Sequence, residues 1–187
     1  MTHRSLVIDG AGWLQGVRHV ESPNWDRRPA ETPVDLLVVH AISLPPGEYG
    51  GPWIDALFTN TLPLDAHPYF SRLAGLRVSS HLLVHRDGSL VQYVSFAHRA
   101  WHAGVSQFAG RHACNDFSIG IELEGSDDAA FDPRQYRVLA NATRALMERF
   151  PGITAQRIVG HSDIAPGRKS DPGPAFDWIH FRRLLAP

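Results

Sequence analysis

The chain has 187 residues, of which 43% are hydrophobic and 20% are charged, and its formal net charge is −1. This length is enough for one well-buried core, so we expect a single domain, and the near-neutral charge gives no overall field that would attract nucleic acid or an anionic membrane. The lone cysteine, Cys114, excludes an internal disulfide, which fits a reducing compartment.

Residues 1–34 are rich in Gly, Pro, Arg and Asp and show no periodicity. We therefore expect an extended arm that packs on a domain formed by residues 35–187. The N-terminal stretch has no apolar run of signal-peptide length, and the aliphatic run at residues 36–39 is far too short to span a bilayer. A soluble, cytoplasmic protein is the expectation.

Residues 35–40 read DLLVVH and predict the first core strand. A continuous apolar run of this length is typical of a central strand buried on both faces. The run ends in His40, and open sheets place their sites at strand ends. The Gly- and Pro-rich residues 43–52 then predict a loop that forms one wall of a groove.

The middle of the chain predicts a short helix and a hairpin. Apolar side chains within residues 53–58 have helical spacing. Residues 78–85 and 89–94 are β-rich runs separated by Arg-Asp-Gly, a strong hairpin signal. His81 and His85 lie four positions apart and so face the same side of a strand. Neither has an acidic or sulfur neighbour in sequence, which favours packing or supporting roles over metal binding.

Residues 115–125, NDFSIGIELEG, alternate apolar and polar side chains. This pattern predicts a half-buried strand whose polar face carries Glu122 and Glu124. The clearest helix of the chain follows, because Asp132 is a good N-cap and a proline occupies the first helical position. Its apolar residues recur every three and four positions until Pro151 and Gly152 end it.

Residues 160–178 read GHSDIAPGRKSDPGPAFDW and place His161, Lys169 and Asp171 within eleven positions. Three prolines remove backbone donors and fix φ, and the glycines add turn freedom. We therefore expect a long ordered loop with little helix or strand. Ordered loops of this length inside a compact domain are usually functional. A short helix from Trp178 closes the chain.

The chemistry of the residue types favours His40, His161 and Asp171 as metal ligands. Two imidazoles and a carboxylate fill three tetrahedral positions on Zn²⁺ and leave the fourth for water, as in catalytic zinc sites. Zinc would lower the pKa of that water to about 7. The same ligands also hold non-haem Fe(II) in oxygenases, so an iron enzyme is an alternative.

Hydrolysis of an amide also requires proton transfer to the leaving nitrogen and stabilisation of the oxyanion. Glu122 suits the proton transfer, and Lys169 offers a fixed positive charge two residues before Asp171. Each residue taken singly also has an ordinary structural explanation. Spacing alone therefore leaves the zinc interpretation open.

Five segments carry a resemblance to a known family: residues 36–48 except Ala41, which departs from the family pattern, and residues 50–58, 99–108, 114–125 and 160–178. Together they resemble the amidase_2 family of zinc amidases, in particular the 1,6-anhydro-N-acetylmuramyl-L-alanine amidases of bacterial cell-wall recycling. The similarity runs from about Gly12 to the C-terminus. It implies an α/β (α+β) fold in a single domain, with a central mixed β-sheet flanked by helices, as in peptidoglycan-recognition proteins.

The resemblance also implies roles for individual residues. It implies that His40, His161 and Asp171 are the zinc ligands. It also implies that Glu122 is the catalytic glutamate and Lys169 the catalytic lysine. Trp101 would lie beside the anhydro-sugar, and Arg77 would meet the anionic peptide.

The implied reaction is hydrolysis of the amide between the lactyl group of 1,6-anhydro-N-acetylmuramic acid and L-alanine of the stem peptide. The substrate would be an anhydromuropeptide, whose pool controls β-lactamase induction in some bacteria. A monomer without a nucleic-acid or membrane partner is expected. The same fold also serves peptidoglycan-recognition proteins that bind muropeptides without cleaving them, so a non-catalytic binding module is the alternative.

Overall fold

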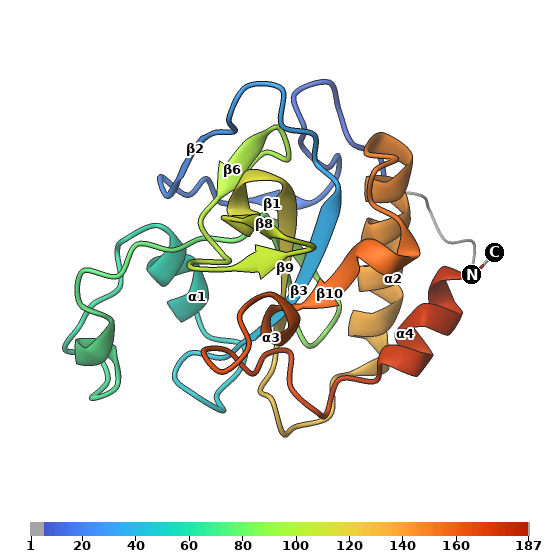
Figure 1. Cartoon of the computed structure of the whole chain (residues 1–187). Coiled ribbons are helices and arrows are strands. Elements are labelled where there is room, and N and C mark those ends of the chain that lie inside the picture. Colours follow the sequence, from blue (N-terminus) through green and yellow to red (C-terminus); the bar gives the residue numbers. More distant parts are fainter. Residues whose placement is uncertain (1–5, 187) are drawn as a thin grey trace.

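The computed structural model describes residues 6–186, so the first five residues of the expected N-terminal arm lie outside the described part. A mixed sheet of six strands forms the centre of the molecule (Figure 1). Strand β4 runs antiparallel to β5, and the other neighbouring strands of this sheet are parallel. In spatial order the strands are β1 (Arg18–His19), β5 (Leu90–Gln92), β4 (Leu82–Val84), β9 (Ser118–Glu124), β3 (Leu36–Ile42) and β10 (Ile158–Gly160).

Helices and short turns surround this sheet. The helices are α1 (Trp53–Phe58), α2 (Pro133–Arg149), α3 (His161–Ile164) and α4 (Trp178–Leu185), and the 3₁₀ turns are η1 (Phe70–Leu73), η2 (Cys114–Asp116) and η3 (Ala155–Arg157). Two small antiparallel pairs join β2 (Trp25–Arg27) to β6 (His98–Ala100) and β7 (Gln107–Phe108) to β8 (Arg111–His112). None of these helices is long and apolar enough to cross a membrane.

The two faces of the sheet bury different side chains. One face packs against α2 and α4, which lie side by side in Figure 1, and its core includes Val39, Ile121 and Leu139. The other face packs partly against α1, whose Leu57 shares a cluster with Leu83. Side chains alternate along a strand, so the residues next to Val39 and Ile121 face away from α2. The sequence therefore sends His40 and Glu122 to the same face.

The main predicted elements are confirmed. The structure has a single domain with a mixed sheet flanked by helices. It also contains the core strand β3, the hairpin of β4 and β5 and the helix α2. Helix α2 begins as predicted, because the Asp132 side chain accepts from the Arg134 N–H and the Gln135 side chain accepts from the Asp132 N–H. This reciprocal pair satisfies donors that the first helical turn leaves open.

Three sequence expectations need correction. Strand β9 is buried on both faces rather than half-buried, because loops and the His102 ring cover its polar side. Strand β3 continues to Ile42, so His40 lies within the strand and not at its end. The loop at residues 160–178 opens with a helical turn, α3, because the Asp163 carboxylate accepts from the Gly160 N–H at its start.

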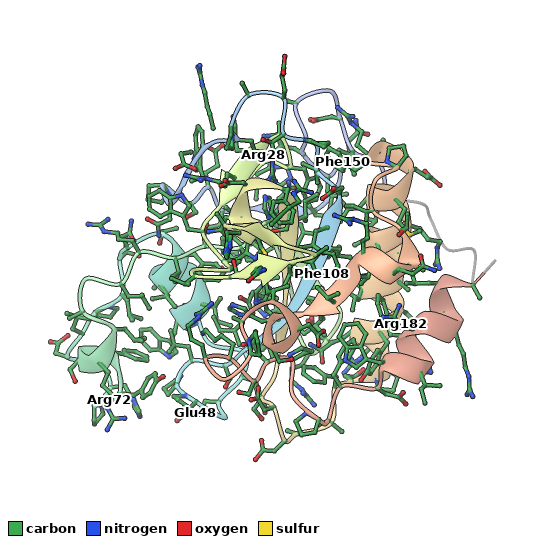
Figure 2. The ribbon with its side chains drawn as sticks, in the orientation of Figure 1. Arg28, Glu48, Arg72, Phe108, Phe150 and Arg182 are labelled. Carbon is green, nitrogen blue, oxygen red and sulfur yellow. The ribbon has the colours of Figure 1, made fainter. Side chains whose placement is uncertain are left out.

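Residues 6–34 cross the domain and contribute β1 and β2 to its sheets. Arg28, labelled in Figure 2, ties this segment to the beginning of β9. Its guanidinium donates to the carbonyl oxygens of Asn115, Asp116 and Ser118, each at 3.0 Å. These bonds satisfy carbonyls just before β9 and at its first residue, and they hold the chain where it enters the strand.

Candidate metal centre

Strand register places the first two site residues side by side. His40 on β3 is the direct partner of Glu122 on β9, and both face away from α2. Strand β10 flanks β3 on its other side, with Gly160 paired to Val39. His161 is the next residue, so the parallel pairing of β10 and β3 brings it beside His40.

The loop after α3 then returns Asp171 to the two histidines. The Ser162 N–H donates to the Asp171 carbonyl at 2.9 Å, which closes the loop on itself. His40 Nδ1 lies 3.0 Å from His161 Nδ1, and Asp171 Oδ2 lies 3.1 Å from each of these nitrogens. Within residues 6–186 this is the group of His, Cys, Asp and Glu side chains whose geometry suits a metal ion.

The outer nitrogens of both imidazoles have protein partners. His161 Nε2 donates to the Ala103 carbonyl at 3.1 Å, since a carbonyl can only accept. His40 Nε2 lies 2.9 Å from His102 Nδ1. A neutral ring protonated at Nε2 keeps a lone pair on Nδ1. Two lone pairs and a carboxylate oxygen therefore converge on one point, an arrangement that a cation stabilises.

The donor set fits zinc. Ligands about 2.0–2.1 Å from a tetrahedral zinc ion lie roughly 3.3 Å from one another, close to the separations observed. Burial lowers the pKa of His40 to about 4, so its ring is neutral at neutral pH. Burial alone would raise the pKa of Asp171, but its contacts with His161 and His40 outweigh burial and hold that pKa well below its ordinary value. At neutral pH the neutral His40 imidazole and the Asp171 carboxylate therefore face the His161 ring.

Glu122 lies next to this group with one oxygen unused. Its side chain is buried, and Oε2 has no hydrogen-bond partner among the described residues. Burial raises the pKa of Glu122 well above its ordinary value, and the negative charge of Asp171 adds to this effect. A buried carboxyl oxygen without a partner costs about 1–3 kcal/mol or more, so such groups are typical of functional sites.

Lys169 lies on the exposed part of the same loop. Its positive charge opposes the rise in the pKa of Glu122 and contributes to the low pKa of His40. No ion pair of the described residues involves Lys169, so its ammonium group is available to a ligand. The structure thus brings five of the predicted site residues into one region.

Trp101 pairs with Ser79, which lies shortly after Arg77 in the sequence. The Ser79 N–H donates to the Trp101 carbonyl, and the Trp101 N–H donates to Ser79 Oγ. Arg77 precedes Ser79 by two residues, and its side chain is exposed. No hydrogen bond or ion pair of the described residues joins the side chain of Arg77 or Trp101 to the three candidate ligands.

The sequence interpretation missed the supporting role of His102. Gly120 is the available signal, because a glycine inside a strand often marks a close approach. A Cβ atom at Gly120 would lie 2.5 Å from His102 Cγ, so the His102 ring fits here only because residue 120 has no side chain.

Glu124 fastens the loop at residues 43–52 near the same edge of the sheet. Its carboxylate accepts from the Gly50 N–H at 2.6 Å and the Arg86 N–H at 3.1 Å, and it lies 3.3 Å from His85 Nδ1. A pocket of about 490 Å³ opens beside it. Its lining is Tyr49, Gly50, His85, Arg86, Asp87, Ser89 and Glu124.

The His85–Glu124 pair predicts a pH-dependent contribution to stability. Its hydrogen bond to Glu124 raises the pKa of His85. A raised pKa in the folded state stabilises the fold below the unfolded value, about 6.5, and this contribution is lost as pH rises through the folded value. The free energy of unfolding of the wild type should therefore exceed that of His85→Gln by more at about pH 6 than at about pH 9. Urea unfolding of both chains measures this difference in the free energy of unfolding. An equal or larger difference at the higher pH would contradict the predicted contribution of the pair.

Two histidines, an aspartate and a buried glutamate that meet beside a mixed sheet indicate a hydrolytic enzyme. Comparison with known proteins supports this class. Residues 30–174 match Amidase_2, N-acetylmuramoyl-L-alanine amidase. The chain therefore belongs to the Amidase_2 family, as the resemblance predicted.

Individual relatives agree with this assignment. The chain is 62% identical over 175 residues to the 1,6-anhydro-N-acetylmuramyl-L-alanine amidase AmpD of Escherichia coli (strain K12), which covers 94% of this chain and 95% of that one. A crystal structure of a Se-Met AmpD derivative superposes with a TM-score of 0.94 at 58% identity, covering 97% and 100%. The crystal structure of AmpDh3 from Pseudomonas aeruginosa in complex with anhydromuramic pentapeptide superposes with a TM-score of 0.60 at 29% identity. The match covers 87% of this chain and 65% of that one.

Proposed function

We propose that this chain is a zinc-dependent amidase of peptidoglycan recycling. Its reaction is hydrolysis of the amide between the lactyl group of 1,6-anhydro-N-acetylmuramic acid and L-alanine of the stem peptide. The observation that carries the proposal is the meeting of His40, His161 and Asp171 beside the unpartnered Glu122 oxygen. The Escherichia coli relative named above is named for the same activity.

The three ligands would hold Zn²⁺, which supplies a Lewis acid and lowers the pKa of a bound water when present. Glu122 then acts as the general base, since Oε2 is free to take a proton from the attacking water. The same oxygen returns that proton to the leaving nitrogen of L-alanine. Burial favours this second step, because it raises the pKa of Glu122 and makes the protonated state accessible.

Lys169 stabilises the negative charge that develops on the carbonyl oxygen of the substrate. Its charge already acts on both His40 and Glu122, and no carboxylate of the described residues neutralises it by an ion pair. A positioned charge in a partly desolvated site stabilises a transition state more than it would in water. Lys169 is therefore the residue of this chain assigned to the oxyanion.

Trp101 and Arg77 complete the proposed substrate contacts. Trp101 is half-buried and offers a ring face to the anhydro-sugar, while the exposed Arg77 guanidinium suits a carboxylate of the stem peptide. In this proposal residues 6–34, the described part of the N-terminal arm, pack on an amidase domain that begins at residue 35. We also propose that the enzyme is cytoplasmic and monomeric.

Two alternatives predict different behaviour. A non-catalytic muropeptide-binding module needs neither a complete ligand set nor a buried base, and this chain has both. An Fe(II) oxygenase uses the same ligand types but needs oxygen and would not hydrolyse an amide anaerobically. The presence of Glu122 beside the ligands favours the amidase.

Mass spectrometry of the reaction products tests the proposal. We expect the purified chain to convert an anhydromuropeptide into free stem peptide and anhydro-N-acetylmuramic acid, with the mass of one water added. A chelator should abolish the conversion, and added Zn²⁺ should restore it. Binding of the anhydromuropeptide without any product would support the binding module instead.

A further inference from the structure

A line of buried hydrogen bonds runs outward from His40. His40 Nε2 lies 2.9 Å from His102 Nδ1, and His102 Nε2 lies 3.1 Å from Ser118 Oγ. All three side chains are buried. The proposed reaction uses neither His102 nor Ser118, although both are polar and lie in the core.

The position of each proton in these hydrogen bonds follows from His40, which would bind the metal through Nδ1. A ligand that binds through Nδ1 carries its own proton on Nε2 when the ring is neutral. His40 therefore donates to His102 Nδ1, which must be unprotonated to accept. The proton of His102 then lies on Nε2 and is donated to Ser118 Oγ. Every contact in the line has one donor and one acceptor.

The segment that contains His102 also supports the second imidazole. His102 Nδ1 accepts from His40, and the carbonyl of the next residue, Ala103, accepts from His161 Nε2. The backbone N–H groups of both residues donate to Asn115 Oδ1, at 3.1 Å and 2.8 Å. Two consecutive residues, held by one amide side chain, thus contact the outer nitrogens of both candidate ligands.

The His102 ring has little freedom to turn away. A Cβ at Gly120 would lie 2.5 Å from Cγ and 2.6 Å from Nδ1 of this ring, so the ring rests directly on the backbone of β9. Its plane is nearly perpendicular to that of His40, at 86°, with the ring centroids 5.0 Å apart. This edge-on arrangement directs the Nε2–H of His40 toward His102.

We propose that His102 is a positioning residue that, together with Ser118, fixes the tautomer and ring orientation of His40 for metal binding. Metal-binding histidines generally donate their second N–H to a protein acceptor, and loss of that acceptor typically lowers metal affinity 10–100-fold. A neutral histidine in this position holds the ligand without adding a second negative charge. The inference rests on the proposed zinc site.

A pair of isosteric substitutions tests the role of the acceptor. His102→Asn and His102→Leu leave side chains of nearly the same shape, but Asn can place an oxygen near the position of Nδ1. We expect His102→Leu to bind Zn²⁺ about 10–100-fold more weakly than the wild type in a chelator-competition titration. His102→Asn should retain most of the affinity. Equal Zn²⁺ affinity for wild type and both variants would overturn the proposal.

Two further measurements decide the case even if the His102 variants fail to fold. Ser118→Ala keeps the ring and its packing but removes the acceptor of the His102 proton, so a smaller loss of Zn²⁺ affinity is expected. ¹⁵N NMR of the wild-type imidazoles should show the His102 proton on Nε2. A His102 proton on Nδ1, or an unchanged Zn²⁺ affinity in Ser118→Ala, would contradict the proposed line of hydrogen bonds.

These experiments separate failure of this inference from failure of the proposed function. If the wild-type chain binds no Zn²⁺, the metal site itself is wrong and the positioning role falls with it. If the wild type binds Zn²⁺ and hydrolyses its substrate while the variants match it in affinity, only the role of His102 is rejected.

Discussion

Glu122→Gln should lower kcat by about 10²–10⁴-fold while Zn²⁺ content stays unchanged. The substitution keeps the shape of the side chain but removes its ability to take a proton from water. Zinc binding should survive because Glu122 is not among the three converging ligands. Steady-state kinetics with an anhydromuropeptide, combined with elemental analysis of the same sample, measures both quantities.

Glu124→Gln provides a matched control. Glu124 lies two residues further along the same face of β9 and is also buried, but its oxygens are occupied by Gly50, Arg86 and His85. We expect this change to reduce kcat far less than Glu122→Gln. Near-normal hydrolysis by Glu122→Gln would show that another group transfers the proton.

Asp171→Ala is expected to lose Zn²⁺ and, with it, activity. The change removes the anionic ligand and leaves two imidazoles, which is a poor set for a site that keeps an open position. Zn²⁺ affinity should fall by more than the 10–100-fold typical of a lost supporting hydrogen bond. Chelator-competition titration gives this affinity directly.

Asp177→Ala is the control for a general effect of losing an aspartate from this region. Asp177 accepts from the His180 N–H at the start of α4 and is not one of the three converging residues. Its loss should weaken the helix end and leave Zn²⁺ affinity near the wild-type value. Tight Zn²⁺ binding by Asp171→Ala would remove this residue from the ligand set.

Local patterns predicted the elements that depend on local physics. The apolar run of β3 and the capped, three-and-four spacing of α2 appear in the structure where the sequence placed them. Both signals arise from burial and from satisfaction of backbone groups within a short stretch. Such signals need no knowledge of the rest of the fold.

The convergence of the site could not be derived from spacing. His40 and His161 are 121 residues apart and meet because β10 pairs with β3 in one particular register. The chemistry of the residue types favoured these two ligands. Only the parallel pairing of the strands, however, brings their Nδ1 atoms to 3.0 Å from each other. Nothing in the local sequence of either strand specifies that pairing.

The error at β9 has the same origin. Alternation correctly placed Glu122 and Glu124 on one face, but it equated a polar face with a solvent-exposed one. In the fold that face is covered by His102, which rests on Gly120, and by the loop that Glu124 holds at Gly50. The polar face of this strand is therefore the interior of the candidate site.

The metal content of the purified wild-type chain, measured by elemental analysis, tests the proposed zinc site most directly. The convergence of His40, His161 and Asp171 predicts about one Zn²⁺ per chain, removed by a chelator and absent from Asp171→Ala. A wild-type chain that carries no zinc and binds none when it is supplied would contradict the proposed site.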